Sequence, residues 1–229
     1  MGGLAGRSAR RRPGGAGWRA AVNTPLSTAQ PDLFGSGDVL PPGFVFTPGF
    51  VTPAEEAALI ALAATLPFAE ARYHQYTARR RVVAWGSARH AIAGDEPNRQ
   101  PLHALPAPLA ALRTRLAAWA SLAADEIVQV LMSEYRPGTP LGWHRDAPQY
   151  ELIAGVSLGG PARLRLRPWP PESGDRDDVI SLDLAPRSAY RMSGAARWGW
   201  QHGLPPVPAL RWSVTMRSAR ASAIRPSAG

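Results

Sequence analysis

Near its C-terminus the chain reads Arg211-Trp212-Ser213-Val214-Thr215-Met216-Arg217, a strict alternation of polar and apolar residues. A β-strand with this pattern places its four polar side chains on one face and its three apolar ones on the other. If the polar face is buried, its two guanidiniums require a bound anion or acidic partners, because burying an unpaired charge costs several kcal/mol. Alternatively, the polar face is exposed to solvent and only the apolar face is core.

Similar short runs fill the chain beyond Asp125. We expect strands at 127–135, 152–158, 163–167, 179–184, 188–192 and 211–217, separated by turns. Upstream, the sequence predicts short strands within 43–50 and at 82–85 and two helices. The first helix starts at the capping sequence Thr52-Pro53-Ala54-Glu55 and runs to Thr65, and the second covers 108–122. Helices followed by many strands predict an α+β chain whose core is an antiparallel sandwich or jelly roll, supported by N-terminal helices.

The 229 residues divide into three parts. Residues 1–38 contain glycine pairs, several arginines and no apolar periodicity. This composition predicts a disordered basic extension or, alternatively, a transit peptide. We expect residues 39–220 to form the folded domain and residues 221–229 to be a C-terminal tail.

The composition also limits the classes of partner. The formal net charge is +9, and all 26 basic residues are arginine. A basic surface favours polyanions such as nucleic acid, although codon bias is an alternative source of the arginine excess. Cysteine is absent, which excludes disulfides and is compatible with the cytoplasm. No apolar run is long enough to cross a bilayer, so we expect a soluble monomer without a membrane partner.

A candidate metal site lies in the second half of the chain. His144 and Asp146 are two residues apart, so on a strand their side chains point to the same face. His202 lies far downstream and would have to be brought in by a neighbouring strand. Two imidazoles and one carboxylate are the ligand set of non-haem Fe(II) oxygenases. A His-x-Asp sequence alone also arises by chance, with a purely structural role.

Six ordered elements resemble the AlkB family of Fe(II)/2-oxoglutarate-dependent dioxygenases. They are Tyr135, Pro137-Gly138, His144-x-Asp146, Gly155-Val156-Ser157-Leu158, His202 and Arg211-x-Ser213-x-Thr215-x-Arg217. The resemblance covers about residues 40 to 220. It implies a double-stranded β-helix, which is a jelly roll, with an N-terminal extension that forms a substrate lid.

The resemblance also implies roles for individual residues. His144, Asp146 and His202 would be the catalytic Fe(II) ligands. Tyr135 would donate its phenol to the cosubstrate 2-oxoglutarate, Arg211 would pair with its distal carboxylate, and Arg217 would lie near its other carboxylate or its metal-bound end. Ser213 falls where the family often has Asn. The cosubstrate would chelate iron through two oxygens and leave one position for O2.

Residues for the substrate are harder to assign. Tyr76, Arg79, Arg80 and Arg81 could stack on a base and hold phosphates. Trp143 could line the pocket or, alternatively, pack around it. The alternative for the arginine run is a hairpin with a solvated basic face.

Three functions remain open at this stage. The resemblance and the charge favour oxidative N-demethylation of alkylated DNA or RNA. Repair members of the family commonly have Asn where this chain has Ser133 and an acidic residue where it has Pro148, which favours a dioxygenase acting on a protein or small molecule. The third alternative is a catalytically silent basic binding module.

Overall fold

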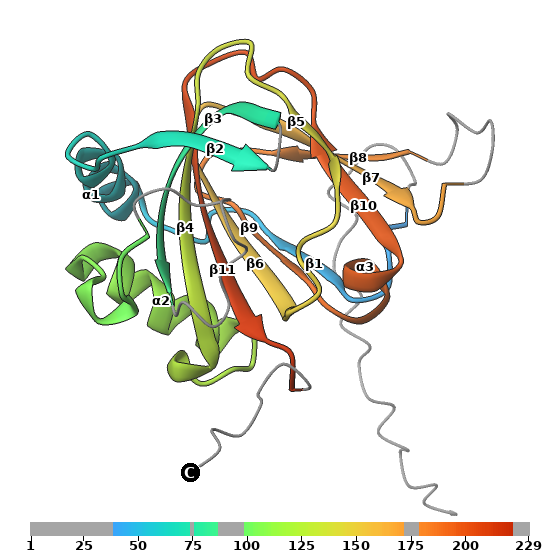
Figure 1. The fold of residues 1–229 in the computed structure, drawn as a ribbon, viewed down its shortest axis with the longest axis horizontal. Helices are drawn as coiled ribbons and strands as arrows, with labels where there is room; N and C mark the ends of the chain where they lie inside the picture. Colours follow the sequence, from blue (N-terminus) through green and yellow to red (C-terminus); the bar gives the residue numbers. More distant parts are fainter. Residues whose placement is uncertain (1–38, 74–75, 87–98, 172–178, 222–229) are drawn as a thin grey trace, which may run out of the picture. The chain divides into compact units, whose positions relative to one another are not determined.

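A computed structural model of the chain describes residues 39–73, 76–86, 99–171 and 179–221 (Figure 1). The predicted extension 1–38 and all but the first residue of the predicted tail 221–229 lie outside these ranges. Among the residues described, no helix is long and apolar enough to cross a membrane.

Two antiparallel sheets form the described domain. The larger has seven strands in the order β1-β9-β6-β11-β4-β3-β2, and the smaller has four in the order β5-β10-β7-β8. The large sheet comprises β1 (Phe44–Thr47), β2 (Ala69–Tyr73), β3 (Tyr76–Gly86), β4 (Ile127–Tyr135), β6 (Tyr150–Gly159), β9 (Ala189–Met192) and β11 (Arg211–Ala219). The small sheet comprises β5 (Leu141–His144), β7 (Ala162–Pro168), β8 (Ile180–Leu184) and β10 (Trp200–Leu204).

The helices follow from local sequence signals. In α1 (Pro53–Ala63) the Thr52 side chain accepts a hydrogen bond from the Glu55 backbone, and the Glu55 side chain accepts one from the Thr52 backbone, so both ends of the predicted capping box are made. The predicted second helix is α2 (Ala107–Trp119), which ends before Ser121 turns into the left-handed region with φ 61°. A short helix, α3 (Gly194–Trp198), precedes β10, and two 3₁₀ turns occupy Leu102–Ala104 and Ala124–Glu126.

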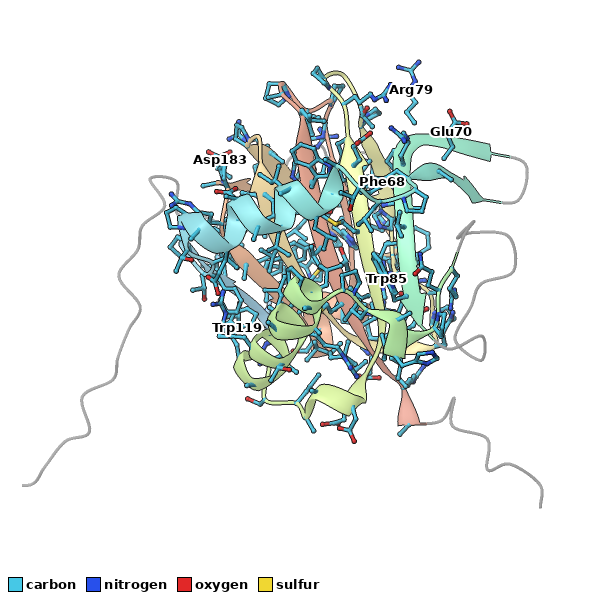
Figure 2. All side chains as sticks on the ribbon, turned by 90° about the vertical axis from the view of Figure 1, so that its left-hand side faces the viewer. Phe68, Glu70, Arg79, Trp85, Trp119 and Asp183 are labelled. Atoms are coloured by element: carbon cyan, nitrogen blue, oxygen red, sulfur yellow. The ribbon has the colours of Figure 1, made fainter. Side chains whose placement is uncertain are left out.

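Helices α1 and α2 cover the outer face of the large sheet (Figures 1 and 2). Their leucines pack against apolar side chains of β3, β4, β6 and β11, and Leu109, Leu116 and Trp85 are completely buried. Burying a leucine contributes about 1.5–3 kcal/mol. This apolar layer therefore holds the large sheet in place without using its other face.

The central strand β11 is buried on both faces. It pairs with β6 on one side and β4 on the other, and Val214 and Met216 belong to the core beneath the helices. The polar face of the strand points the opposite way and is also buried, with only 2% of Arg211 and 9% of Arg217 exposed. The alternative of a solvent-exposed polar face is therefore wrong, because the small sheet covers it.

The architecture is the predicted one, an α+β chain with an antiparallel jelly-roll core. The predicted strands from 127 onwards correspond to β4, β6, β7, β8, β9 and β11. The predicted runs did not include β2, and β5 and β10 were expected only as carriers of the candidate metal ligands.

Candidate active site

The polar face of β11 forms one wall of a pocket between the two sheets. Charged and polar side chains come mainly from the large sheet, whereas the small sheet supplies leucines and the two histidines. The pocket is lined by Arg80, Leu131, Tyr135, Leu141, His144, Asp146, Ile153, Leu164, Leu184, Tyr190, His202, Leu204, Arg211, Ser213, Thr215 and Arg217.

The small sheet brings the three candidate metal ligands together. Antiparallel pairing of β5 with β10 sets His202 directly opposite His144, and their ring centroids lie 4.2 Å apart. Asp146 follows two residues after His144, and one ligand atom from each of the three residues lies within 4.8 Å of the others. His144 Nδ1 lies 2.9 Å from the carbonyl oxygen of Gly142. Because a carbonyl only accepts, Nδ1 carries the proton and Nε2 keeps a lone pair for a metal.

Burial and neighbouring charges keep the two histidines in the neutral form. Burial, together with the neighbouring His144, lowers the pKa of His202 to about 3. Its contact with Asp146, 3.5 Å from Nε2 to Oδ2, is therefore no ion pair at neutral pH, although the distance would allow one. Burial and nearby positive charge also lower the pKa of His144. Both imidazoles are neutral, which is the form that binds metals.

Arg217 holds the carboxylate of Asp146. Its Nε and Nη2 lie 2.8 and 2.6 Å from Oδ1, and Nη1 donates to Gln129. Burial alone would raise the pKa of Asp146, but Arg217 and the two histidines keep it well below its usual range. The other oxygen, Oδ2, is buried and has no hydrogen-bond partner among the described residues. A buried, charged and partly unsatisfied carboxylate beside two neutral imidazoles fits a divalent cation.

Arg197 fixes the backbone around the candidate metal ligand Asp146. This side chain, 3% exposed in α3, uses Nη2 to contact the carbonyl oxygens of Asp146, Ala147 and Tyr150 at 2.8–3.0 Å. A guanidinium that bridges three carbonyl groups restrains the turn from β5 to β6. The sequence analysis did not identify Arg197, because no local pattern marks a side chain that binds backbone atoms far away in sequence.

Arg211 forms the second part of the site. Its Nε donates to Ser157 Oγ at 3.2 Å, and its Cζ lies 5.0 Å from the centre of the Tyr135 ring. Nη1 is buried without a hydrogen-bond partner among the described residues, and within the same residues no carboxylate forms an ion pair with Arg211. An arginine stays charged even when burial lowers its pKa. The pocket therefore presents a buried cation that fits a carboxylate ligand.

The structure brings the predicted cosubstrate residues together in this wall. Tyr135 and Ser213 line the pocket beside Arg211, and Arg217 lies at the metal end on Asp146. Burial raises the pKa of Tyr135, but Arg80 and Arg211 outweigh it and lower the pKa below its ordinary value. The phenol therefore lies between two cations.

Tyr190 in β9 also lines the pocket and was missed. It pairs in register with Gly155, where an added Cβ would come within 2.5 Å of the tyrosine ring. A glycine inside a buried strand is the one signal that could have indicated such a close approach.

The residues predicted to bind the substrate do not lie together: one lines the pocket and the others that the structure describes lie outside it. Alternation along β3 sends Arg80 into the pocket, with Nη1 3.5 Å from the Tyr135 hydroxyl, whereas Arg79 is exposed. Arg81 does not line the pocket but pairs with Glu134 at 3.0 Å. Trp143 also lies outside the pocket lining, stacked with arginines of β7. The described structure includes only the backbone of Tyr76, in β3.

Comparisons with known proteins agree with this geometry. The sequence profile of the 2OG-Fe(II) oxygenase superfamily matches residues 43–222. The "Alkylated DNA repair protein ALKBH8 homolog" of Arabidopsis thaliana is 28% identical over 199 residues, which cover 78% of this chain but only 56% of that relative. The chain thus spans little more than half the length of that protein.

Two solved structures share the fold at low sequence identity. OsALKBH1 aligns with a TM-score of 0.57 and 15% identity, covering 79% of this chain and all of that one. A prolyl hydroxylase from Trichoplax adhaerens, in complex with a peptide of hypoxia inducible factor, aligns with a TM-score of 0.57 and 12% identity, covering 82% and 88%. These likenesses concern the arrangement of the strands.

Proposed function

Because the chain belongs to the 2OG-Fe(II) oxygenase superfamily, whose enzymes use Fe(II), 2-oxoglutarate and O2, we propose that it removes N-methyl groups oxidatively from alkylated nucleic acid. The single observation that carries the enzymatic part is the joint placement in one pocket of the His144, Asp146 and His202 cluster and the buried cation Arg211. The likeness to a plant relative named as an alkylated DNA repair protein supports the choice of substrate.

We assign the metal ligands from the geometry of the cluster. His144 and His202 would each give a neutral imidazole nitrogen, and Asp146 would give Oδ2 while Arg217 holds Oδ1. Bound there with 2-oxoglutarate and O2, Fe(II) supplies the oxidation of a substrate C–H bond. When the oxidised carbon is an N-methyl group, it leaves as formaldehyde and the amine is freed.

The opposite end of the pocket would hold the cosubstrate. Arg211 presents a planar fork that can bind the distal carboxylate of 2-oxoglutarate through two parallel hydrogen bonds. Tyr135 and Ser213 lie in the same wall and supply hydroxyl groups for the carboxylate. Because Arg211 is buried, this binding takes place away from water, where an ion pair is stronger.

Arg80 would face the substrate. It is the arginine of the 79–81 run that reaches the pocket, beside Tyr135, and its charge acts on His144. A phosphate next to the alkylated nucleotide is the anionic group of a nucleic acid that such a guanidinium fits. We propose that Tyr76 and Arg79 extend this contact outside the pocket, and that Arg81, held by Glu134, supports the strand.

The direct test measures formaldehyde release from methylated oligonucleotides with Fe(II), 2-oxoglutarate and O2. We expect release by the wild type and none by His144→Ala. Pro148, which stands where repair members commonly carry an acid, favours a second candidate, a dioxygenase acting on a protein or small molecule. Cosubstrate turnover that couples only to peptides or small molecules would establish that candidate. Absence of turnover with any substrate would favour a silent binding module.

A further inference from the structure

The outer face of the small sheet carries a second group of arginines, away from the pocket. In β7 the leucines Leu164 and Leu166 are buried, and Leu164 lines the pocket, so alternation turns Arg163, Arg165 and Arg167 to the opposite face. The alternation of arginine and leucine at 163–167 thus gives the strand one cationic and one apolar face.

Two of these arginines stack on one tryptophan. The Cζ atoms of Arg165 and Arg167 lie 5.0 and 4.5 Å from the centre of the Trp143 ring. Trp143 belongs to β5, and β10 runs between β5 and β7. At the crossing point β10 has Gly203, where an added Cβ would come within 2.9 Å of the Leu141 carbonyl oxygen. The indole thus reaches across a strand that presents no side chain at this position.

A third arginine–tryptophan pair lies just beyond the ends of the same two strands. Arg145 follows β5 and stacks on Trp169, which follows β7, with Cζ 4.9 Å from the ring centre. Trp169 is 39% exposed, one of the few large apolar side chains on the described surface. We call Trp143, Arg145, Arg165, Arg167 and Trp169 the arginine–tryptophan strip.

The three arginines of the strip have no carboxylate partner within 4.0 Å among the described residues. Within the part of the chain that the structure describes, their hydrogen bonds use only Nε of Arg167, which donates to Gln201, and Nη1 of Arg145, which donates to the Trp198 carbonyl. Stacking on an indole fixes the plane of a guanidinium and lowers the side-chain entropy lost on binding. The remaining donors are therefore preorganised for anionic oxygens.

We propose that the arginine–tryptophan strip binds the phosphodiester backbone of the nucleic-acid strand outside the active site. The identity of the polyanion rests on the proposed function, and the chain's charge of +9 agrees with it. Guanidiniums cover the Trp143 ring, so the contact is with phosphates and not with bases. Binding through the strip is therefore independent of base sequence and weakens with salt.

The test measures binding of a fluorescent, unmethylated single-stranded oligonucleotide to the full chain by anisotropy, over a range of salt. The variant Arg165→Gln/Arg167→Gln should bind on the order of tenfold more weakly. Its slope of log K against log salt should fall by about 1.4, the value expected when two phosphate contacts are lost. The control Arg136→Gln/Arg187→Gln removes the same charge elsewhere and should bind like the wild type. Equal losses in both double variants would overturn the proposal.

A second variant keeps the charge and removes the ring. Trp143→Leu should weaken binding severalfold and leave the salt slope unchanged, because both arginines remain but are no longer held in place. Melting temperatures of all variants show whether they fold. Wild-type affinity in Trp143→Leu would contradict the preorganisation of the strip.

The described residues do not include four acidic residues between β7 and β8, Glu172, Asp175, Asp177 and Asp178, so the test also covers their charges. The arginine variants are therefore repeated in a chain with these four changed to their amides. Arginine-dependent binding that occurs only in the amide background would contradict the proposal for the natural chain.

Two further outcomes separate this proposal from others. Binding to phosphatidylserine vesicles without binding to the oligonucleotide would assign the strip to membranes and overturn it. Failure to demethylate any oligonucleotide, combined with strip-dependent binding, would refute the proposed activity and leave the binding surface standing.

Discussion

Replacing Arg211 with methionine should separate cosubstrate binding from stability. The arginine is 2% exposed, and it contacts Ser157 and the Tyr135 ring but forms no ion pair with any described residue. Without a ligand it is a buried cation that has no counterion among the described residues. An apolar residue of similar volume in such a place is neutral or stabilising by about 1–4 kcal/mol, offset by about 1 kcal/mol for the lost hydrogen bond. Arg211→Met should therefore be at least as stable as the wild type.

The same change should cost most of the affinity for 2-oxoglutarate. Hydrogen bonds to charged groups contribute about 1.5–3 kcal/mol each, so losing a bidentate pair costs about 3–6 kcal/mol and raises Kd roughly 100- to 20,000-fold. At a cosubstrate concentration of about 100 times the wild-type Kd, binding stabilises the wild type by about 2.7 kcal/mol and the variant by less than about 0.5 kcal/mol. Urea unfolding under anaerobic conditions, with Fe(II) present and with or without 2-oxoglutarate, measures both quantities.

Arg191→Met is the matched control. Arg191 is half-buried and, like Arg211, lies near an aromatic ring, that of Trp119, but it donates to the Ala120 carbonyl outside the pocket. The control should lose some stability and keep its cosubstrate affinity. An Arg211→Met protein that is several kcal/mol less stable, yet still gains the full 2.7 kcal/mol from 2-oxoglutarate, would show that this arginine supports the fold and not the ligand.

Three further predictions concern the metal end and the neighbouring wall. In the metal-free protein, the free energy of unfolding should fall by up to about 1.4 kcal/mol per pH unit below about pH 6.5, because the unfolded chain protonates His202 while burial lowers its pKa in the folded protein to about 3. Urea unfolding from pH 7 to 4 measures this dependence. If His202→Gln showed the same dependence of stability on pH, His202 would not be its cause. Gly155→Ala should cost about 1–3 kcal/mol, since its methyl group meets the ring of Tyr190, whereas Gly142→Ala enters open space; equal unfolding midpoints would refute the close contact. Arg217→Met should weaken Fe(II) binding about 10- to 100-fold in an anaerobic titration, because a metal-ligating carboxylate loses its holding group; unchanged affinity would contradict that role.

Local patterns were enough to predict the strands that form the large-sheet wall of the site, but not β5 and β10. The alternation at 211–217 is a strand, the Thr52 capping box begins a helix, and the run 127–135 coincides with β4. These signals depend on neighbours within a few residues, so they can be recognised in the sequence without knowledge of the tertiary structure. The two-residue spacing predicted that the side chains of His144 and Asp146 share one face of a strand; the structure brings them together, although β5 ends at His144.

Contacts between distant strands could not be predicted in the same way. The pairing of His202 with His144 depends on which strands become neighbours in the small sheet, and nothing local to either histidine specifies this. The arginines at 79–81 looked like one basic group, although strand alternation could have indicated that Arg80 points away from its neighbours. The placement of Trp143 outside the pocket follows from the same alternation, because it precedes an inward-pointing ligand.

The two buried faces of β11 have separate roles, one in the apolar core and one in the pocket, and this separation affects which substitutions the protein can accept during evolution. Val214 and Met216 pack in the core beneath the helices. Arg211, Ser213 and Arg217 line the pocket on the other side of the strand. Substitutions that change the size of apolar side chains on the helix-facing side thus leave the pocket residues in place. Substitutions in the pocket that change the substrate class likewise need not destabilise the fold. A one-residue insertion, by contrast, would exchange the two faces at once and abolish both.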